Sequence, residues 1–85
     1  MDFEQVEKIF EDTEINIDDV KGDKTLAGFN IIAKYTDSVI EGADADVIYS
    51  ADIDHLIEKG ITEEDLIRLA ELGFYIMDEY LATGA

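Results

Sequence analysis

Residues 61–74 show the clearest hydrophobic pattern in the chain and predict an amphipathic helix. Leu66 and Leu69 stand at helical spacing, so their side chains share one face, while acidic residues fill the first turn, where the helix dipole favours negative charge. Thr62 and Asp65 have the spacing of a capping box, in which each side chain accepts a hydrogen bond from the other residue's backbone N–H.

Both ends of this helix are also specified. Ile61 and Leu66 occupy the positions of a hydrophobic staple, which fixes the direction from which the chain approaches the helix. Gly73 provides the left-handed conformation that ends a helix and places Phe74 over Leu69, as in a Schellman motif. The apolar stripe needs a cover, so we expect the rest of the chain to pack around this helix.

Residues 2–12 predict an earlier helix, with Asp2 as its N-cap and an i, i+4 ion pair between Glu4 and Lys8. Its apolar stripe consists of Phe3, Val6, Ile9 and Phe10.

The next segments are less clearly patterned. Alternating isoleucines suit a short strand over 14–20, and 21–24 has the composition of a turn. Residues 25–37 fit both a helix and a strand, because apolar residues recur there at both periods. The length of this segment, and a cap at Asp23 or Thr25, favour the helix.

The second half of the chain adds the strands. Residues 41–44 are expected to break the chain, and 46–51 predict the clearest strand, rich in β-branched and aromatic side chains. Asp52 then caps one or two turns of helix within 52–60. Residues 74–82 fit either a hairpin or a further helix, and the glycine that ends the preceding helix favours the hairpin.

These elements predict one α+β domain over residues 1–85, with two or three short helices packed on a small sheet. The core is expected to draw on Phe3, Val6, Phe10, Phe29, Ile32, Val47, Tyr49, Leu56, Leu66, Leu69 and Phe74.

Charge is the strongest functional signal. The chain has 22 acidic and 6 basic residues, a formal net charge of −16, whereas a magnitude of about 2–8 is enough to keep a small domain soluble. Such a surface repels nucleic acid and anionic lipid, and attracts basic grooves or cations. The alternative is that the acids only hydrate the surface.

Catalytic equipment is scarce, so we expect a protein that is not an enzyme and needs no cofactor. The chain has no cysteine, its single histidine is His55, and neither serine has the glycine context of a nucleophile elbow. EF-hand loops starting at Asp44 or Asp52 lack the required oxygen ligands at their fifth positions, so no metal site is predicted. No apolar run suits a membrane span and no basic leader is evident, which favours a cytoplasmic protein.

Seven acidic residues exceed what helix capping requires and are the predicted partner-binding residues. Carboxylates two apart on a strand lie roughly 6.6 Å from each other, close to the spacing of phosphates along a nucleic-acid strand. If held rigidly, they would form an array that a basic groove accepts in place of phosphates. The seven are Asp44, Asp46, Asp54, Glu63, Glu64, Asp78 and Glu79.

Residues 42–74, with the preceding Ile-Ile-Ala-Lys-Tyr, resemble a set of small uncharacterised proteins of phages and their bacterial hosts. Their pattern runs helix, D-x-I-Y strand, T-x-E-D helix, Leu-Gly-aromatic and a short hairpin. The resemblance implies a fold and a mobile-element setting but no activity. Many such sequences have a histidine where this chain has Ala45. By size and acidity alone, the chain also resembles phage-encoded DNA mimics and anti-CRISPR inhibitors.

The leading hypothesis is therefore a non-enzymatic, DNA-mimicking inhibitor that occupies the basic nucleic-acid-binding surface of a host protein. The alternative is an accessory or structural module whose acidity only provides solubility and which could form a homodimer through an apolar face.

Overall fold

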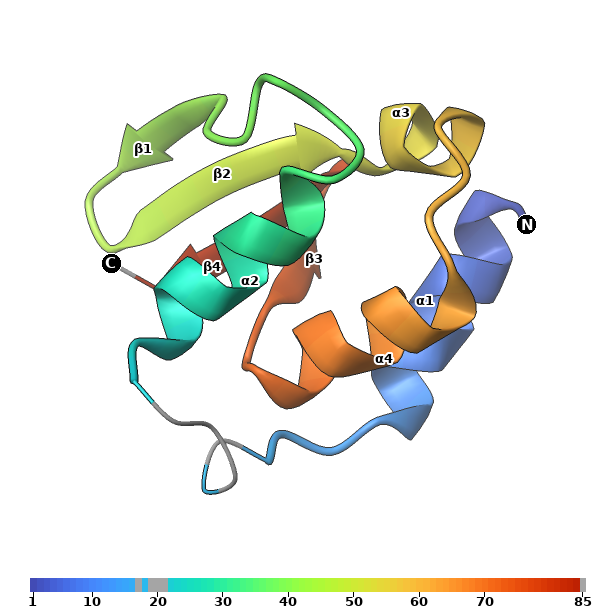
Figure 1. The fold of residues 1–85 in the computed structure, drawn as a ribbon, viewed down its shortest axis with the longest axis horizontal. Helices are drawn as coiled ribbons and strands as arrows, with labels where there is room; N and C mark the ends of the chain where they lie inside the picture. Colours follow the sequence, from blue (N-terminus) through green and yellow to red (C-terminus); the bar gives the residue numbers. More distant parts are fainter. Residues whose placement is uncertain (17, 19–21, 85) are drawn as a thin grey trace.

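The sheet consists of two antiparallel hairpins that are joined through their inner strands (Figure 1). The strand order is β1-β2-β4-β3, so the two shortest strands form the edges. The strands are β1 (Gly42–Asp44), β2 (Val47–Asp52), β3 (Tyr75–Met77) and β4 (Tyr80–Gly84). The hairpin predicted near the C-terminus is confirmed.

Four helices lie in the part of the chain that this computed structural model describes, residues 1–16, 18 and 22–84. They are α1 (Phe3–Asp12), α2 (Lys24–Ile32), α3 (Ile53–Glu58) and α4 (Glu63–Glu71). The α+β class is confirmed, with four helices where two or three were expected.

Each of these helices begins at a short polar side chain that accepts a hydrogen bond from a backbone N–H of the first turn. The cap at Asp23 accepts from the N–H groups of Thr25 and Leu26 and shows that the ambiguous segment 25–37 starts as a helix. The four caps are Asp2, Asp23, Asp52 and Thr62.

The C-terminus of α4 has the predicted Schellman geometry. Gly73 has a φ of 92°, its N–H donates to the carbonyl of Ala70, and the N–H of Phe74 donates to the carbonyl of Leu69. Its N-terminus differs from the prediction in one respect. The hydroxyl of Thr62 accepts from the N–H of Asp65, but the Asp65 carboxylate bonds to Lys34 and Tyr35, outside the helix.

The core lies between the helices and one face of the sheet. Helix α4 packs between α1 and α2, and all three helices contribute to a buried cluster. Leu81 of β4 belongs to the same cluster and packs against it from the sheet. The staple residues Ile61 and Leu66 are both buried in this cluster. Its members are Val6, Ile32, Ala51, Ile53, Leu56, Ile61, Leu66, Leu69, Leu72, Phe74 and Leu81.

Three local predictions are wrong. Residues 42–44 do not simply break the chain, because pairing with β2 holds them as the edge strand β1. Val47 and Tyr49 are only partly buried and are not part of the core, because they share the sheet face opposite Leu81. Lys8 pairs with Asp12, at 3.7 Å, and not with Glu4.

The predicted strand over 14–20 falls partly on residues 17, 19 and 20, which lie outside the described residues, as does residue 21 of the predicted turn. The described residues 14–16 are not in a strand.

Gly28 lets α2 approach Phe74 closely. A Cβ at this position would overlap the aromatic ring of Phe74, which is 3% exposed and makes an edge-to-face contact with Phe29 at 5.6 Å between ring centroids. Glycine inside a helix costs about 1 kcal/mol relative to alanine. At this position glycine is nevertheless required, because the ring of Phe74 occupies the space of a Cβ atom.

We therefore expect Gly28→Ala to destabilise the protein by about 1–3 kcal/mol through overpacking, in spite of its better helix propensity. In a Phe74→Leu background, where the ring is removed, the same substitution should be much less costly. Urea denaturation of the two single variants and the double variant measures the difference. A stabilised Gly28→Ala protein would show that Phe74 does not limit this position.

Candidate functional site

The seven predicted partner-binding carboxylates are all exposed, and they separate into three groups. Asp44 and Asp46 lie at the β1–β2 turn, whereas Asp78 and Glu79 form the β3–β4 turn. The backbone N–H of Ile53 donates to the carbonyl of Glu79, at 2.9 Å, which brings the neighbouring Asp54 to the second group. Glu63 and Glu64 open helix α4 and form the third.

The first two groups lie at opposite ends of the sheet. Strands β2 and β4 are antiparallel, with Val47 beside Gly84 and Asp52 beside Tyr80. The six residues of β2 therefore separate the two turns, by roughly 16 Å at 3.3 Å per residue. The structure does not join the seven carboxylates into one continuous array, but it places negative charge at both ends of the sheet.

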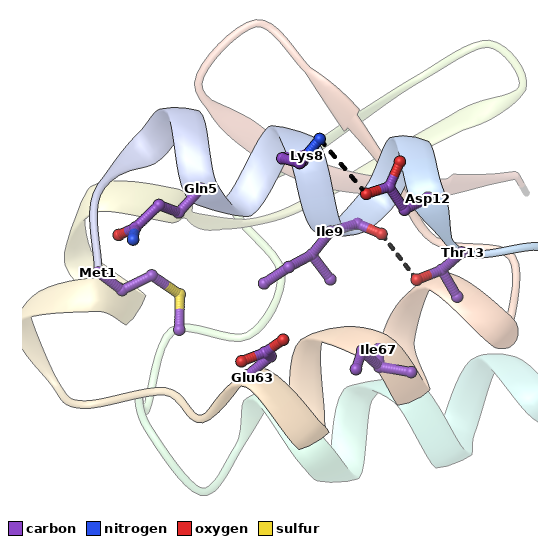
Figure 2. Close-up of a pocket in the computed structure, with 8 residues that line it drawn as sticks. All are labelled: Met1, Gln5, Lys8, Ile9, Asp12, Thr13, Glu63 and Ile67. Carbon is purple, nitrogen blue, oxygen red and sulfur yellow. Dashed lines mark hydrogen bonds and ion pairs between the residues drawn. The ribbon is translucent and has the colours of Figure 1, made fainter.

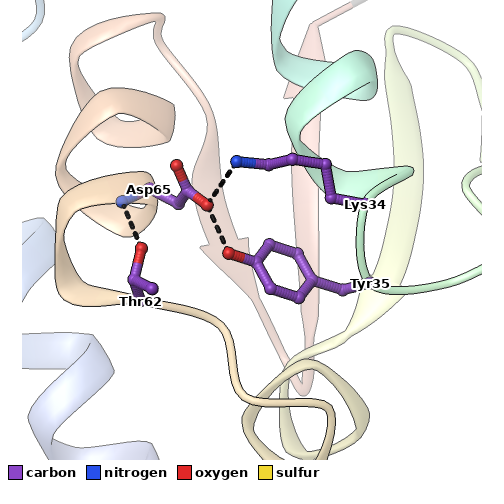
Figure 3. A network of polar contacts seen from close by, with 4 residues as sticks. All are labelled: Lys34, Tyr35, Thr62 and Asp65. Atoms are coloured by element: carbon purple, nitrogen blue, oxygen red, sulfur yellow. Dashed lines mark hydrogen bonds and ion pairs between the residues drawn. The ribbon is translucent and has the colours of Figure 1, made fainter.

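Asp65 has a structural role. Its carboxylate accepts a hydrogen bond from the Tyr35 hydroxyl and forms an ion pair with Lys34, with 2.7 Å between Nζ and Oδ2 (Figure 3). Lys34 and Tyr35 belong to the turn that follows α2, and Asp65 lies in the first turn of α4. The three side chains therefore fasten these two helices to each other.

Burial raises the pKa of Asp65, but the hydrogen bonds from Lys34 and Tyr35 outweigh this effect and hold the pKa of the carboxyl below its ordinary value. The hydrogen bond to Asp65 also raises the pKa of Lys34. Asp65 therefore stays ionised in the folded protein at a pH where it would begin to protonate in the unfolded chain.

The sheet face away from the helices is open and carries aromatic side chains. Ala82 lies between Tyr49 and Tyr75 in the register of the three strands, and Tyr80 pairs with Met77 in the next row. All four large side chains are partly exposed and absent from the core cluster, whereas Ala82 beneath them is fully buried. An uncovered aromatic surface on a small domain often marks an interaction site.

Tyr49 and Tyr80 border a recess of about 330 Å³ on this open face. Their rings meet edge to face, with centroids 6.3 Å apart and planes at 72°. The recess is also lined by Glu41, Gly42 and Asp78, so it combines two aromatic rings with two carboxylates. Sequence reasoning missed it, because Tyr49 was expected in the core. One feature of the sequence could have indicated this surface: a two-residue turn in the second hairpin places Tyr75, Met77 and Tyr80 on the same face of the sheet.

Two other recesses lie on the helical side. One, of about 580 Å³, opens between α1 and α4, and Figure 2 shows Met1, Ile9 and Ile67 around it with polar side chains at its border. The other, of about 440 Å³, is lined by Lys34, His55 and Lys59 among others. His55 is partly exposed, as expected for a surface histidine.

No protein-family model, no curated protein and no solved structure matches this chain. Among the described residues, no group of three or more histidine, cysteine or acidic side chains is arranged to hold a metal ion. No described helix is long and apolar enough to cross a membrane.

Asp65→Asn should lower the free energy of unfolding by about 1–2 kcal/mol at neutral pH, because the charge-assisted hydrogen bonds are weakened. The pKa of Asp65 is depressed on folding, so its contribution is complete above about pH 4 and is lost as the pH falls further through the folded-state pKa. The difference in urea stability between wild type and variant should shrink accordingly in acid. A difference that is independent of pH would contradict this role of the charge.

Proposed function

We propose that this protein is a non-enzymatic cytoplasmic inhibitor that binds the basic nucleic-acid-binding surface of another protein and keeps nucleic acid away from it. The net charge of −16 supports this proposal, because six basic residues cannot neutralise 22 acidic ones. Among the described residues, Lys8, Lys34 and Arg68 form ion pairs with carboxylates of the same chain. Most of the negative charge is left for a partner.

The observation that favours a binding role over simple hydration is the composition of the open sheet face. Partly exposed tyrosines occupy its centre, and the acidic turns at 44–46 and 78–79 stand at its two ends. Protein interfaces have this organisation, with aromatic side chains at the centre and a polar rim. A negative rim selects a positively charged partner.

The same open face is the feature that favours the alternative, an accessory module that forms a homodimer. A homodimer through this face would place the acidic turns of two copies against each other. Each copy has a net charge of −16, and like charges opposed across an interface are unfavourable. A basic partner meets no such repulsion, so it is the better occupant.

To test the proposal, the immobilised protein is incubated with a bacterial lysate at low salt, and the partner that it captures is purified. Its affinity should fall steeply, by about tenfold or more, between 50 and 200 mM salt, because dissolved ions screen the attraction between exposed charges. In a competition assay the protein should displace labelled nucleic acid from the partner. A ternary complex of partner, nucleic acid and this protein would refute the proposal.

Two charge variants make this experiment specific. The first converts the seven predicted partner-binding acids to their amides and should abolish both capture and displacement. The second removes the same number of exposed charges elsewhere and should weaken them only modestly. It carries Glu4→Gln, Glu7→Gln, Glu11→Gln, Glu14→Gln, Asp18→Asn, Asp37→Asn and Glu58→Gln. Unchanged binding by the first variant would favour the accessory module.

A further inference from the structure

The recess on the open sheet face is held by the sheet itself. Tyr49 lies in β2 and Tyr80 in β4, two strands that pair directly. The backbone N–H of Glu41 donates to the carbonyl of Tyr49, at 2.8 Å, which fixes Glu41 at one side of the recess. Asp78 is in the tight β3–β4 turn, with a φ of 55°. The backbone positions from which the two rings and the two acidic side chains project are therefore set before any ligand binds.

Gly42 keeps the recess open. It pairs with Tyr49 across the β1–β2 ladder, so a side chain at this position would project from the same face as the Tyr49 ring. A Cβ there would meet no atom within 4 Å, and the φ of Gly42 is not in the left-handed region. A larger residue would therefore be tolerated by the backbone and would fill the space.

The residues that line the recess suit a planar cation that can stack on an aromatic ring and donate hydrogen bonds from its edge to a carboxylate. Aromatic faces attract cations through the ring quadrupole, and carboxylates accept charge-assisted hydrogen bonds. The guanidinium of arginine offers both, because it stacks on rings and presents a planar set of N–H donors, whereas the ammonium of lysine is a compact, strongly hydrated charge.

We propose that this recess, lined by Tyr49 and Tyr80 with Glu41 and Asp78, binds the guanidinium group of an arginine side chain on the basic partner. The inference builds on the proposed function and names the contact that anchors it. Charge complementarity selects this occupant over a second copy of the chain, which would bring further carboxylates to the same place.

The 85-residue protein, labelled with ¹⁵N and with ¹³C on its tyrosines, is titrated with N-acetylarginine N-methylamide at constant ionic strength and followed by NMR. The matched control ligand is the citrulline derivative, which has nearly the same shape and no charge. The arginine derivative should shift the ring signals of Tyr49 and Tyr80 saturably and leave those of Tyr75 nearly unchanged. The citrulline derivative should produce no saturable shift.

Three variants test the lining, and two of them have a matched control. Asp78→Asn should weaken arginine binding by about fivefold or more, whereas Asp37→Asn, which removes the same charge from a different loop, should change it by less than about twofold. Asparagine tolerates positive φ, so the turn is preserved. Tyr49→Leu should abolish binding and Tyr75→Leu should not. Gly42→Leu should block the recess without changing any charge or ring. The backbone ¹⁵N spectrum shows in each case that the fold is kept.

Several outcomes would overturn the inference. These are equal shifts from citrulline and arginine, equal losses in Asp78→Asn and Asp37→Asn, or unimpaired binding by Gly42→Leu. Shifts of the recess signals on raising the protein concentration alone would assign the surface to a second copy. The titration needs no partner, so a failure of arginine binding and a failure of salt-sensitive partner capture are separate results and can be told apart.

Discussion

The pairing of β2 with β4 is the interaction on which the rest of this structure depends. It joins two hairpins that are separated by helices α3 and α4, and it turns two marginal ribbons into one sheet. On one face, that sheet supports the buried cluster of the helices. On the other, it brings Tyr49 and Tyr80, which are distant in sequence, to a ring separation of 6.3 Å. The open surface is thus a product of the same long-range contact that completes the core.

The acidity of the chain and its small core act against each other. Exposed carboxylates repel one another, and a domain of 85 residues has limited burial with which to resist that repulsion. Some carboxylates offset this cost because they form local interactions that stabilise the fold directly. Asp2, Asp23 and Asp52 cap helices, and Asp65 binds Lys34 and Tyr35. Part of the negative charge therefore has a structural reason, and the rest lies on the exposed surface of helices, turns and loops.

Features that depend on a few neighbouring residues could be predicted from the sequence. The caps at Asp2 and Thr62, the stop at Gly73 and the hairpin after it all follow from the chemistry of single positions, and the structure confirms them. Facts that depend on distant partners were not readable. The strand character of 42–44 comes from β2, because its own residues favour no strand.

The same limit applies to the candidate site. The exposure of the seven acids was predictable from their type, but their separation into three groups depends on strand order. The outward direction of Tyr49 depends on which face the helices cover, and a strand sequence with apolar residues on both faces does not reveal this. Likewise, nothing near Asp65 in the sequence indicates that it binds a lysine and a tyrosine about thirty positions earlier.

The two edge strands have a consequence for how the protein behaves when crowded. β1 and β3 are three residues long, and each runs directly into an acidic turn. An exposed strand edge is a template on which another chain can add by backbone hydrogen bonds, and short edges beside charges resist such addition. The molecule can therefore present an uncovered sheet to a partner without being prone to polymerise into fibrils through its own edges.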